Sequence, residues 1–157
     1  MDSTSPLLKV AREMDALLSE VISLQNDYVA GLCPSCEKPC CKRVGFLFDE
    51  KDMIFAKVSG RGGVPARKRK GKKGCPFLSS FGCLLTPKSR PFTCHRYLCD
   101  RLKEEMAKCE PELVNRLTRK FRRLEELRGK LWTEYLQAQG APGCGLASGG
   151  LYGTRQD

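Results

Sequence analysis

The sequence predicts a mainly α-helical fold, in which long N- and C-terminal helices pack together and an irregular cysteine-rich segment lies between them in the chain. Apolar residues recur every three or four positions near both ends of the chain, which is the spacing of an amphipathic helix. Ten cysteines are present, and eight of them lie between residues 33 and 99. With 157 residues and a hydrophobic share of 41%, the chain is long enough for one domain with a modest core.

The first helix is predicted over residues 6–29. Pro6 suits the first helical position after Ser5, and Gly31 is placed to end the helix. One face carries an apolar stripe formed by Leu7, Val10, Met14, Leu17, Val21, Leu24 and Tyr28. Such a stripe needs a partner, and the simplest one is the other long helix, with the cysteine-rich segment as a cap at one end of the pair.

A short strand and a short helix are predicted next. Residues 44–48 form an apolar run fit for a buried strand, and Asp49 can cap a helix that continues to Val58. Residues 60–73 contain five glycines or prolines and seven basic residues, with no acidic residue. We expect this segment to be a mobile basic loop.

The second long helix is predicted from Pro111 to about Gln139. It is preceded by an irregular region over residues 74–99, and helix is expected to resume around residues 94–109. The apolar stripe of the second long helix is formed by Leu113, Leu117, Phe121, Leu124, Leu127, Leu131 and Tyr135.

The sequence therefore predicts one domain over residues 1–140, followed by a flexible, glycine-rich tail over residues 141–157. No run of about 18 apolar residues that could span a membrane is present, and the N-terminus lacks the pattern of a secretory leader. We therefore expect a cytoplasmic protein. In such a reducing compartment, clustered thiols are more often metal ligands or redox groups than disulfides.

The clustered cysteines form two groups of candidate metal ligands. The first group is Cys33, Cys36, Cys40 and Cys41, and the second is Cys75, Cys83, Cys94 and Cys99. The spacing of Cys33 and Cys36 allows a tight turn that aims both sulfurs at one ion, as in structural zinc sites and in iron–sulfur sites. Spacing alone does not separate these two kinds of centre. A bound metal would also supply folding energy. The basic residues next to these cysteines could offset thiolate charge; they are Lys42, Arg43, Arg90 and Arg96.

The adjacent residues Cys40 and Cys41 bear on the number of sites. Successive side chains in extended backbone point to opposite sides, so the pair indicates either two neighbouring sites or one site with a spare thiol. Cys109 and Cys144 are isolated in the sequence and are not predicted to be ligands. The single histidine, His95, is interpreted as a surface or packing residue, with metal ligation as the alternative.

Several short elements around these cysteines occur in a characteristic order. They are the opening Cys33, Cys36, Cys40 and Cys41, then Gly74-Cys75-Pro76-Phe77-Leu78, Gly82-Cys83, and Arg90-Pro91-Phe92-Thr93-Cys94. In this order they resemble the YkgJ-like cysteine-cluster family, whose members are described as zinc- or iron-chelating proteins. The resemblance covers roughly residues 33–99 and implies that this segment is a metal-binding core. A related cysteine-rich region in flagellin lysine methylases implies iron–sulfur chemistry. The chain departs from the family in the three residues between Cys36 and Cys40, where the family usually has two.

The leading hypothesis for the function is a metal-binding protein, whose cysteine-ligated iron–sulfur cluster or zinc has a structural or electron-handling role. One alternative is an accessory subunit of an iron–sulfur enzyme. Another is nucleic-acid or anionic-protein binding through the basic loop, with Arg61, Arg67, Lys68, Arg69, Lys70, Lys72 and Lys73. The sequence contains no glycine-rich nucleotide motif, no paired carboxylates with a base and no nucleophile with a partner, so it does not indicate an enzyme.

Overall fold

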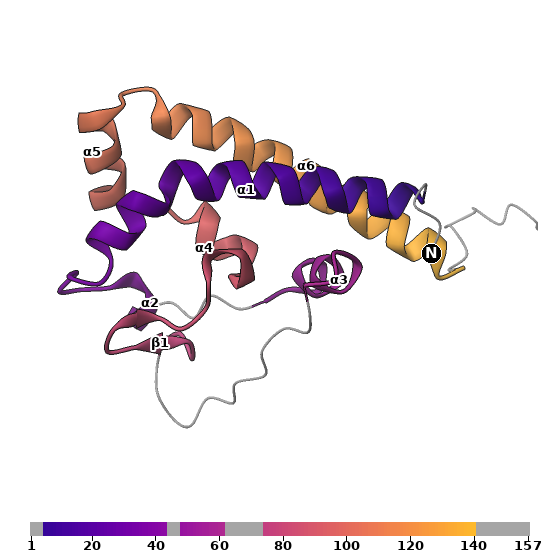
Figure 1. Ribbon diagram of the computed structural model, residues 1–157, viewed down its shortest axis with the longest axis horizontal. Helices are drawn as coiled ribbons and strands as arrows, with labels where there is room; N and C mark the ends of the chain where they lie inside the picture. The colour runs from indigo at the N-terminus through magenta and orange to yellow at the C-terminus, as the bar shows by residue number, and fades with distance from the viewer. Residues whose placement is uncertain (1–4, 44–47, 62–73, 141–157) are drawn as a thin grey trace, which may run out of the picture.

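The computed structural model describes residues 5–43, 48–61 and 74–140, and most of these residues are helical. Helix α1 (Pro6–Leu32) and helix α6 (Leu113–Ala138) are the longest elements. They lie side by side and run in opposite directions (Figure 1). The predicted fold class, with long N- and C-terminal helices packed together, is confirmed. Among the described helices, none combines the length and apolar character needed to cross a bilayer.

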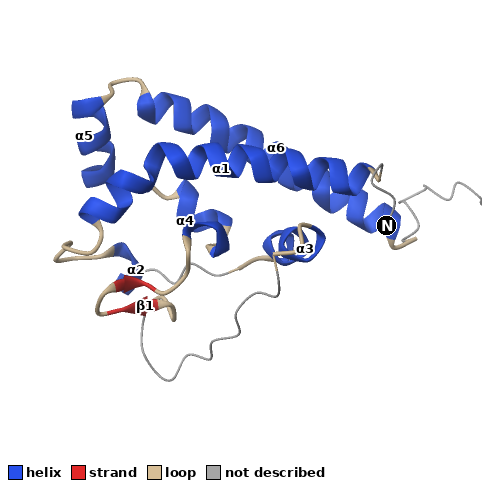
Figure 2. Cartoon of the chain, viewed as in Figure 1, coloured by secondary structure: helices blue, strands red, loops and turns tan. Residues whose placement is uncertain are grey.

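The shorter elements lie around this helix pair. Helix α3 (Glu50–Val58) packs on α1 and α6, and helix α5 (Asp100–Cys109) crosses the end of the pair where α1 finishes (Figure 1). The cysteine-rich elements are helix α2 (Cys40–Arg43), strands β1 (Leu78–Ser79) and β2 (Gly82–Cys83), the 3-10 helix η1 (Pro87–Ser89) and helix α4 (Phe92–Arg96). They lie on one side of the pair, below the C-terminal half of α1 in Figure 2. The expected cap at the end of the pair is therefore wrong, because α5 occupies that position.

The core lies between α1 and α6. The predicted stripe of α6 is buried from Leu113 to Leu131, and Tyr135 packs at its edge. On α1 the buried face is slightly rotated from the predicted one, because it follows Leu7, Val10, Ala11, Met14, Leu18, Val21 and Gln25. Leu17, Leu24 and Tyr28 are partly buried and pack against the same core. A straight helix with 3.6 residues per turn accounts for this rotation over six turns.

The chain between the long helices differs from the sequence-based expectation in three places. Gly31 lies inside α1, which ends at Leu32, because the chain keeps helical geometry through Cys33. The helix expected over residues 94–109 is divided into α4 and α5 by an extended connection over residues 97–99. The hairpin of β1 and β2 was not predicted. The predicted strand over residues 44–48, the basic loop and the C-terminal tail fall largely or wholly outside the described residues.

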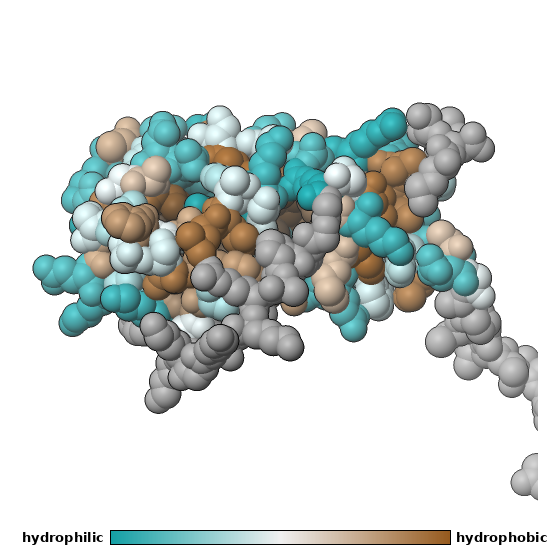
Figure 3. Space-filling model, turned by 60° about the horizontal axis from the view of Figure 1, so that its bottom comes forward, coloured by the Kyte–Doolittle hydropathy of each residue, from teal (hydrophilic) through white to brown (hydrophobic). Residues whose placement is uncertain are grey.

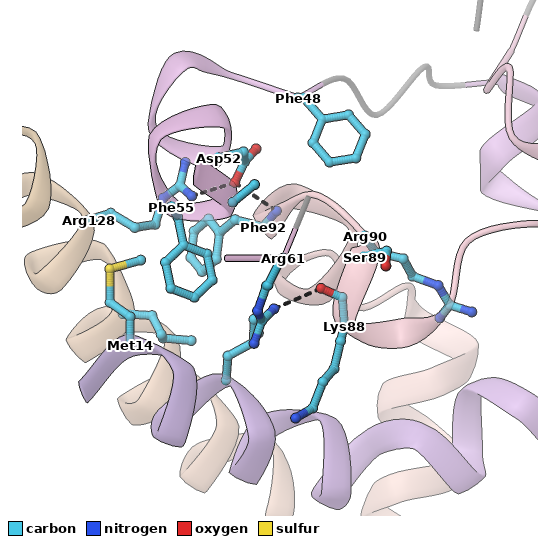
Figure 4. Close-up of a pocket in the computed structure, with 13 residues that line it drawn as sticks. Met14, Phe48, Asp52, Phe55, Arg61, Lys88, Ser89, Arg90, Phe92 and Arg128 are labelled. Carbon is cyan, nitrogen blue, oxygen red and sulfur yellow. Dashed lines mark hydrogen bonds and ion pairs between the residues drawn. The ribbon is translucent and has the colours of Figure 1, made fainter. Parts of the chain in front are cut away.

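A buried ion-pair network joins α6 to α3 and α4. Asp49 caps α3 as predicted and forms a capping box with Asp52. Arg128 of α6, which is 6% exposed, pairs with Asp52 at 2.6 Å and with Asp49 at 2.5 Å, and its guanidinium lies over the ring of Phe92. Figure 4 shows Arg128 and Asp52 pointing toward each other beside the start of α4. Burial alone would raise the pKa of Asp49, but the Asp52 backbone N–H and Arg128 outweigh it and lower that pKa. The network fixes α3 and α4 on the helix pair.

Candidate metal centre

The cysteines that the sequence singled out all line one cavity of about 270 Å³. They are Cys33, Cys36, Cys40, Cys41, Cys75, Cys83, Cys94 and Cys99, and they are called the cavity cysteines below. The rest of the wall is mostly apolar and includes Val29, Phe77 and Leu102. Figure 3 brings forward the side of the molecule on which the cysteine-rich elements lie, and it shows hydrophobic patches on that surface. Two cysteine groups that are far apart in the sequence thus come together.

The first group is placed by the end of α1 and by the turn that follows it. The N–H of Cys33 donates to the carbonyl of Val29 and so continues the helix by one residue. The N–H of Cys36 then donates to the carbonyl of Cys33 at 3.2 Å, which is the tight turn expected from their spacing. Cys40 and Cys41 begin α2.

The second group is attached to the first by a close contact between backbones. The N–H of Cys75 donates to the carbonyl of Cys41 at 2.7 Å. Gly74 permits this approach, because it is buried, has a φ of +105°, and a Cβ atom there would lie 2.7 Å from the Lys42 carbonyl oxygen. Another residue type at position 74 would therefore force Cys75 away from Cys41.

A small hairpin and two helix starts place the remaining cavity cysteines. Cys83 pairs with Leu78 across the hairpin, and the N–H of Leu84 donates to the carbonyl of Phe77. Phe77 is buried and packs edge-on against Phe48, which anchors the hairpin. Cys94 lies in α4, and Cys99 is the residue before α5.

Burial and crowding act against ionisation of these thiols. Burial, followed by the neighbouring Cys40, Cys75 and Cys83, raises the pKa of Cys41 to about 11. Burial, with Cys41, Cys75 and Cys83 nearby, raises the pKa of Cys94 to about 12. The pKa of Cys33 is also raised, first by the protein atoms packed around its thiol and then by Cys40, Cys99 and Cys36, although the residue as a whole is exposed at the cavity mouth. A cation is therefore needed before several of these sulfurs can be thiolates together.

Arg90 is the basic residue that acts on the cavity. Arg90 lines the cavity wall, and its positive charge favours the thiolates of Cys33 and Cys94. The larger effect of burial still leaves the pKa of both thiols above the usual value. Arg96, by contrast, is exposed and pairs with Glu125 at 2.7 Å. Lys42 is exposed, and the side chain of Arg43 lies outside the described part of the chain.

Tyr97 and Arg101 also line the cavity, and their position within two residues of Cys99 was the only signal for them in the sequence.

The donor chemistry fits a zinc ion or an iron–sulfur cluster, because both are held by sets of four thiolates. Within the described residues, no three cysteine, histidine, aspartate or glutamate side chains are already arranged to hold an ion. In a tetrahedral site with metal–sulfur distances of about 2.3 Å, the sulfurs lie about 3.8 Å apart. The cavity cysteines would therefore have to draw together around the metal.

His95 does not belong to the cavity wall. Its side chain is 2% exposed and faces α1, where its Nδ1 lies 3.3 Å from Nε2 of Gln25. Burial, with Arg90 and Arg61 nearby, lowers the pKa of His95 to about 4, although the carbonyls of Pro87 and Arg90 partly offset this. No hydrogen bond of good geometry reaches its Nε2 within the described residues. His95 is thus a neutral packing residue between α4 and α1.

The other candidate residues lie away from the cavity or outside the described residues. Cys109 is exposed and lies beside Tyr28, whereas Cys144 falls in residues 141–157. Arg61 of the basic run turns inward, where it pairs with Asp15, donates to the Lys88 carbonyl and lies over the ring of Phe55. The charge of Arg61 is therefore already paired with that of Asp15. Figure 4 shows the hydrogen bond from Arg61 to the Lys88 carbonyl. The rest of the basic run has no described structure.

Comparisons with known proteins do not identify this site. The chain matches no protein-family model, no curated protein and no solved structure. The resemblance to the YkgJ-like family therefore stays a prediction that rests on the cysteine pattern.

Proposed function

We propose that this protein binds a metal centre, either zinc or an iron–sulfur cluster, through the cavity cysteines, and that the centre holds the cysteine-rich region together. The observation that carries the proposal is that cysteines from five separate places in the chain line a single cavity. Isolated cysteines often serve as small buried apolar residues, but Cys33 and Cys83 are exposed and the others are only half-buried.

The thin apolar support of this region favours the same conclusion. Among the described residues of segments 33–43 and 74–99, the buried side chains are only Phe77, Pro91 and His95. A structural zinc ion supplies on the order of 10 kcal/mol of folding free energy. A metal would thus replace the apolar packing that this region lacks.

The role of the centre is structural or electron-handling. Because Cys33 and Cys83 are exposed, a centre that they ligate would lie near the surface and within reach of a redox partner. An iron–sulfur cluster in this position would suit an accessory subunit of an iron–sulfur enzyme. Either centre requires reduced thiols, which is consistent with a cytoplasmic protein.

The metal content of protein purified without oxygen tests the proposal. Iron with acid-labile sulfide and absorbance near 400 nm would identify an iron–sulfur cluster, and colourless protein with bound zinc would identify the other centre. Cys94→Ser should lower the metal content, whereas Cys109→Ser, which changes a thiol outside the cavity, should not. The proposal is wrong if the chain binds neither Zn²⁺ nor iron and sulfide under reducing conditions.

A further inference from the structure

We propose that the cavity cysteines form two separate sites, with Cys33, Cys36, Cys40 and Cys99 in the first site and Cys41, Cys75, Cys83 and Cys94 in the second. This inference rests on the proposed function, since it divides the same thiols into metal sites. The division does not follow the order of the sequence. Cys41 leaves the opening cluster to join the second site, and Cys99 returns to the first.

The second site is outlined by backbone contacts. The hydrogen bond from Cys75 to the carbonyl of Cys41 fixes these two residues beside each other, and Gly74 permits this approach because it has no Cβ to meet the Lys42 carbonyl. The hairpin starts three residues after Cys75 and returns at Cys83. Cys94 lines the same cavity, where the charges of Cys41, Cys75 and Cys83 would act on its thiol.

The first site is outlined by the end of α1 and the start of α5. The turn after α1 brings Cys36 back onto Cys33. Helix α5 packs against α1, so Cys99, at the start of α5, comes to the end of α1. In agreement with this placement, the charges of Cys40, Cys99 and Cys36 would act on the thiol of Cys33. The extended connection between α4 and α5 makes this arrangement possible, because it redirects the chain between Cys94 and Cys99.

The adjacent pair Cys40 and Cys41 separates the two sites. Both residues are in α2, where successive side chains point about 100° apart around the helix axis. One thiol can therefore serve each site. Among the thiols, Cys40 acts on Cys41 more strongly than Cys75 and Cys83 do, so the two sites are close neighbours and the backbone contact of Cys41 with Cys75 assigns Cys41 to the second site.

The charges around the cavity agree with two neighbouring sites. A divalent ion with four thiolates carries a net charge of about −2, so two such sites repel each other. Arg90 acts on a cysteine of each set, Cys33 and Cys94, which places its positive charge where it offsets both. A zinc ion accepts four ligands, and an iron–sulfur cluster is likewise held by four cysteines, so the division applies to either centre.

Thiol capping of the Zn²⁺-loaded protein tests this division directly. The full chain, with Cys109→Ser and Cys144→Ser to remove the other thiols, is treated with increasing amounts of chelator and then with an alkylating reagent. We expect two zinc ions per chain and an intermediate species with four capped cysteines. Peptide fragmentation should then find the four cysteines of one set capped and the four cysteines of the other set protected. Cys40 and Cys41 should therefore differ, with one capped and the other protected.

Three results would overturn the division. They are a single zinc ion per chain, eight thiols that become reactive together, and an intermediate whose capped cysteines mix the two sets. A chain that binds no Zn²⁺ at all would contradict the proposed function itself, and the division with it.

Matched variants give a second test. Cys36→Ser and Cys83→Ser change one cysteine in each set, and each should retain one of the two zinc ions. In Cys36→Ser the protected thiols should be Cys41, Cys75, Cys83 and Cys94. Loss of both ions from a variant whose helical circular dichroism is intact would contradict two independent sites. The capping experiment does not depend on either variant.

Discussion

In the helix pair, buried leucines fill the space between α1 and α6, whereas in the cysteine-rich region thiols surround a cavity. Leu113, Leu117, Leu124, Leu127 and Leu131 are all 1% exposed or less. Full burial of such a side chain contributes about 1.5–3 kcal/mol. The cysteine-rich region has Phe77 as its main apolar anchor and is otherwise held by backbone and side-chain hydrogen bonds. The comparison teaches that the helix pair has its own apolar core, while the region beside it has little and, under the proposed function, depends on a metal.

The connection between the two regions should show the largest effect of a single substitution. Arg128→Leu should lower the free energy of unfolding by about 3–5 kcal/mol, because it leaves the buried carboxylate of Asp52 without its partner. Urea denaturation measures this. Arg123→Leu is the matched control on the same helix, because Arg123 makes only exposed ion pairs and its loss should cost much less than the loss of Arg128. Equal losses would mean that the buried network does not hold α3 and α4 in place.

The helix pair itself can be compared with the cysteine-rich region by two leucine substitutions. Leu117→Ala should cost about 2–5 kcal/mol, because Leu117 is 0% exposed and its removal leaves a cavity. Leu84, which follows the hairpin, is 54% exposed, and Leu84→Ala should change stability by less than about 0.5 kcal/mol. A large loss at Leu84 in denaturation experiments would show that apolar packing supports the cysteine-rich region after all.

The long helices could be predicted from the sequence because their stability comes from one apolar stripe each, and a stripe is visible in the spacing. The buried ion pairs were missed, although Arg128 lies on the stripe between Leu124 and Leu131 and an arginine in that position signals a buried partner. The Asp49 cap was predicted because it depends only on local sequence.

The cysteine-rich region was less predictable because its geometry depends on contacts between distant segments. The cavity cysteines were all identified, but the approach of Cys75 to Cys41 depends on the shape of the chain between them. The break between α4 and α5 contains no proline or glycine, so the sequence carries no local signal for it. That break determines where Cys99 lies.

Acid should weaken the packing between α4 and α1 through His95. Its pKa is about 4 in the folded protein and near 6.5 in an unfolded chain, so the unfolded state binds the extra proton between these values. Stability should therefore fall as pH decreases from about 6.5 to about 4, by up to about 3 kcal/mol. Denaturation across this range measures the effect, and the part of the pH dependence that is due to His95 should be absent in His95→Gln. A pH dependence that is unchanged in His95→Gln would mean that other groups cause it.

Two glycine substitutions should give smaller and opposite effects. Gly74→Ala should destabilise the cysteine-rich region by about 1–3 kcal/mol and weaken Zn²⁺ binding, because its φ is +105° and the new Cβ would meet the Lys42 carbonyl. Gly31→Ala adds a Cβ with nothing within 4 Å, in the last turns of α1, and should stabilise the helix by about 0.5–1 kcal/mol. Denaturation and zinc titration measure both. Unchanged zinc affinity in Gly74→Ala would contradict the need for close contact between Cys75 and Cys41.

Amide hydrogen exchange with and without the metal tests most directly whether a metal stabilises the cysteine-rich region. Two probes report on that region, the N–H of Cys75 that bonds to Cys41 and the N–H of Leu84 that bonds to Phe77. After verified metal removal we predict that both amides lose protection, while the amides in the middle of α1 and α6 keep theirs. If Cys75 and Leu84 stay as protected as before, the cysteine-rich region is held by its own packing, and a metal is not what stabilises it.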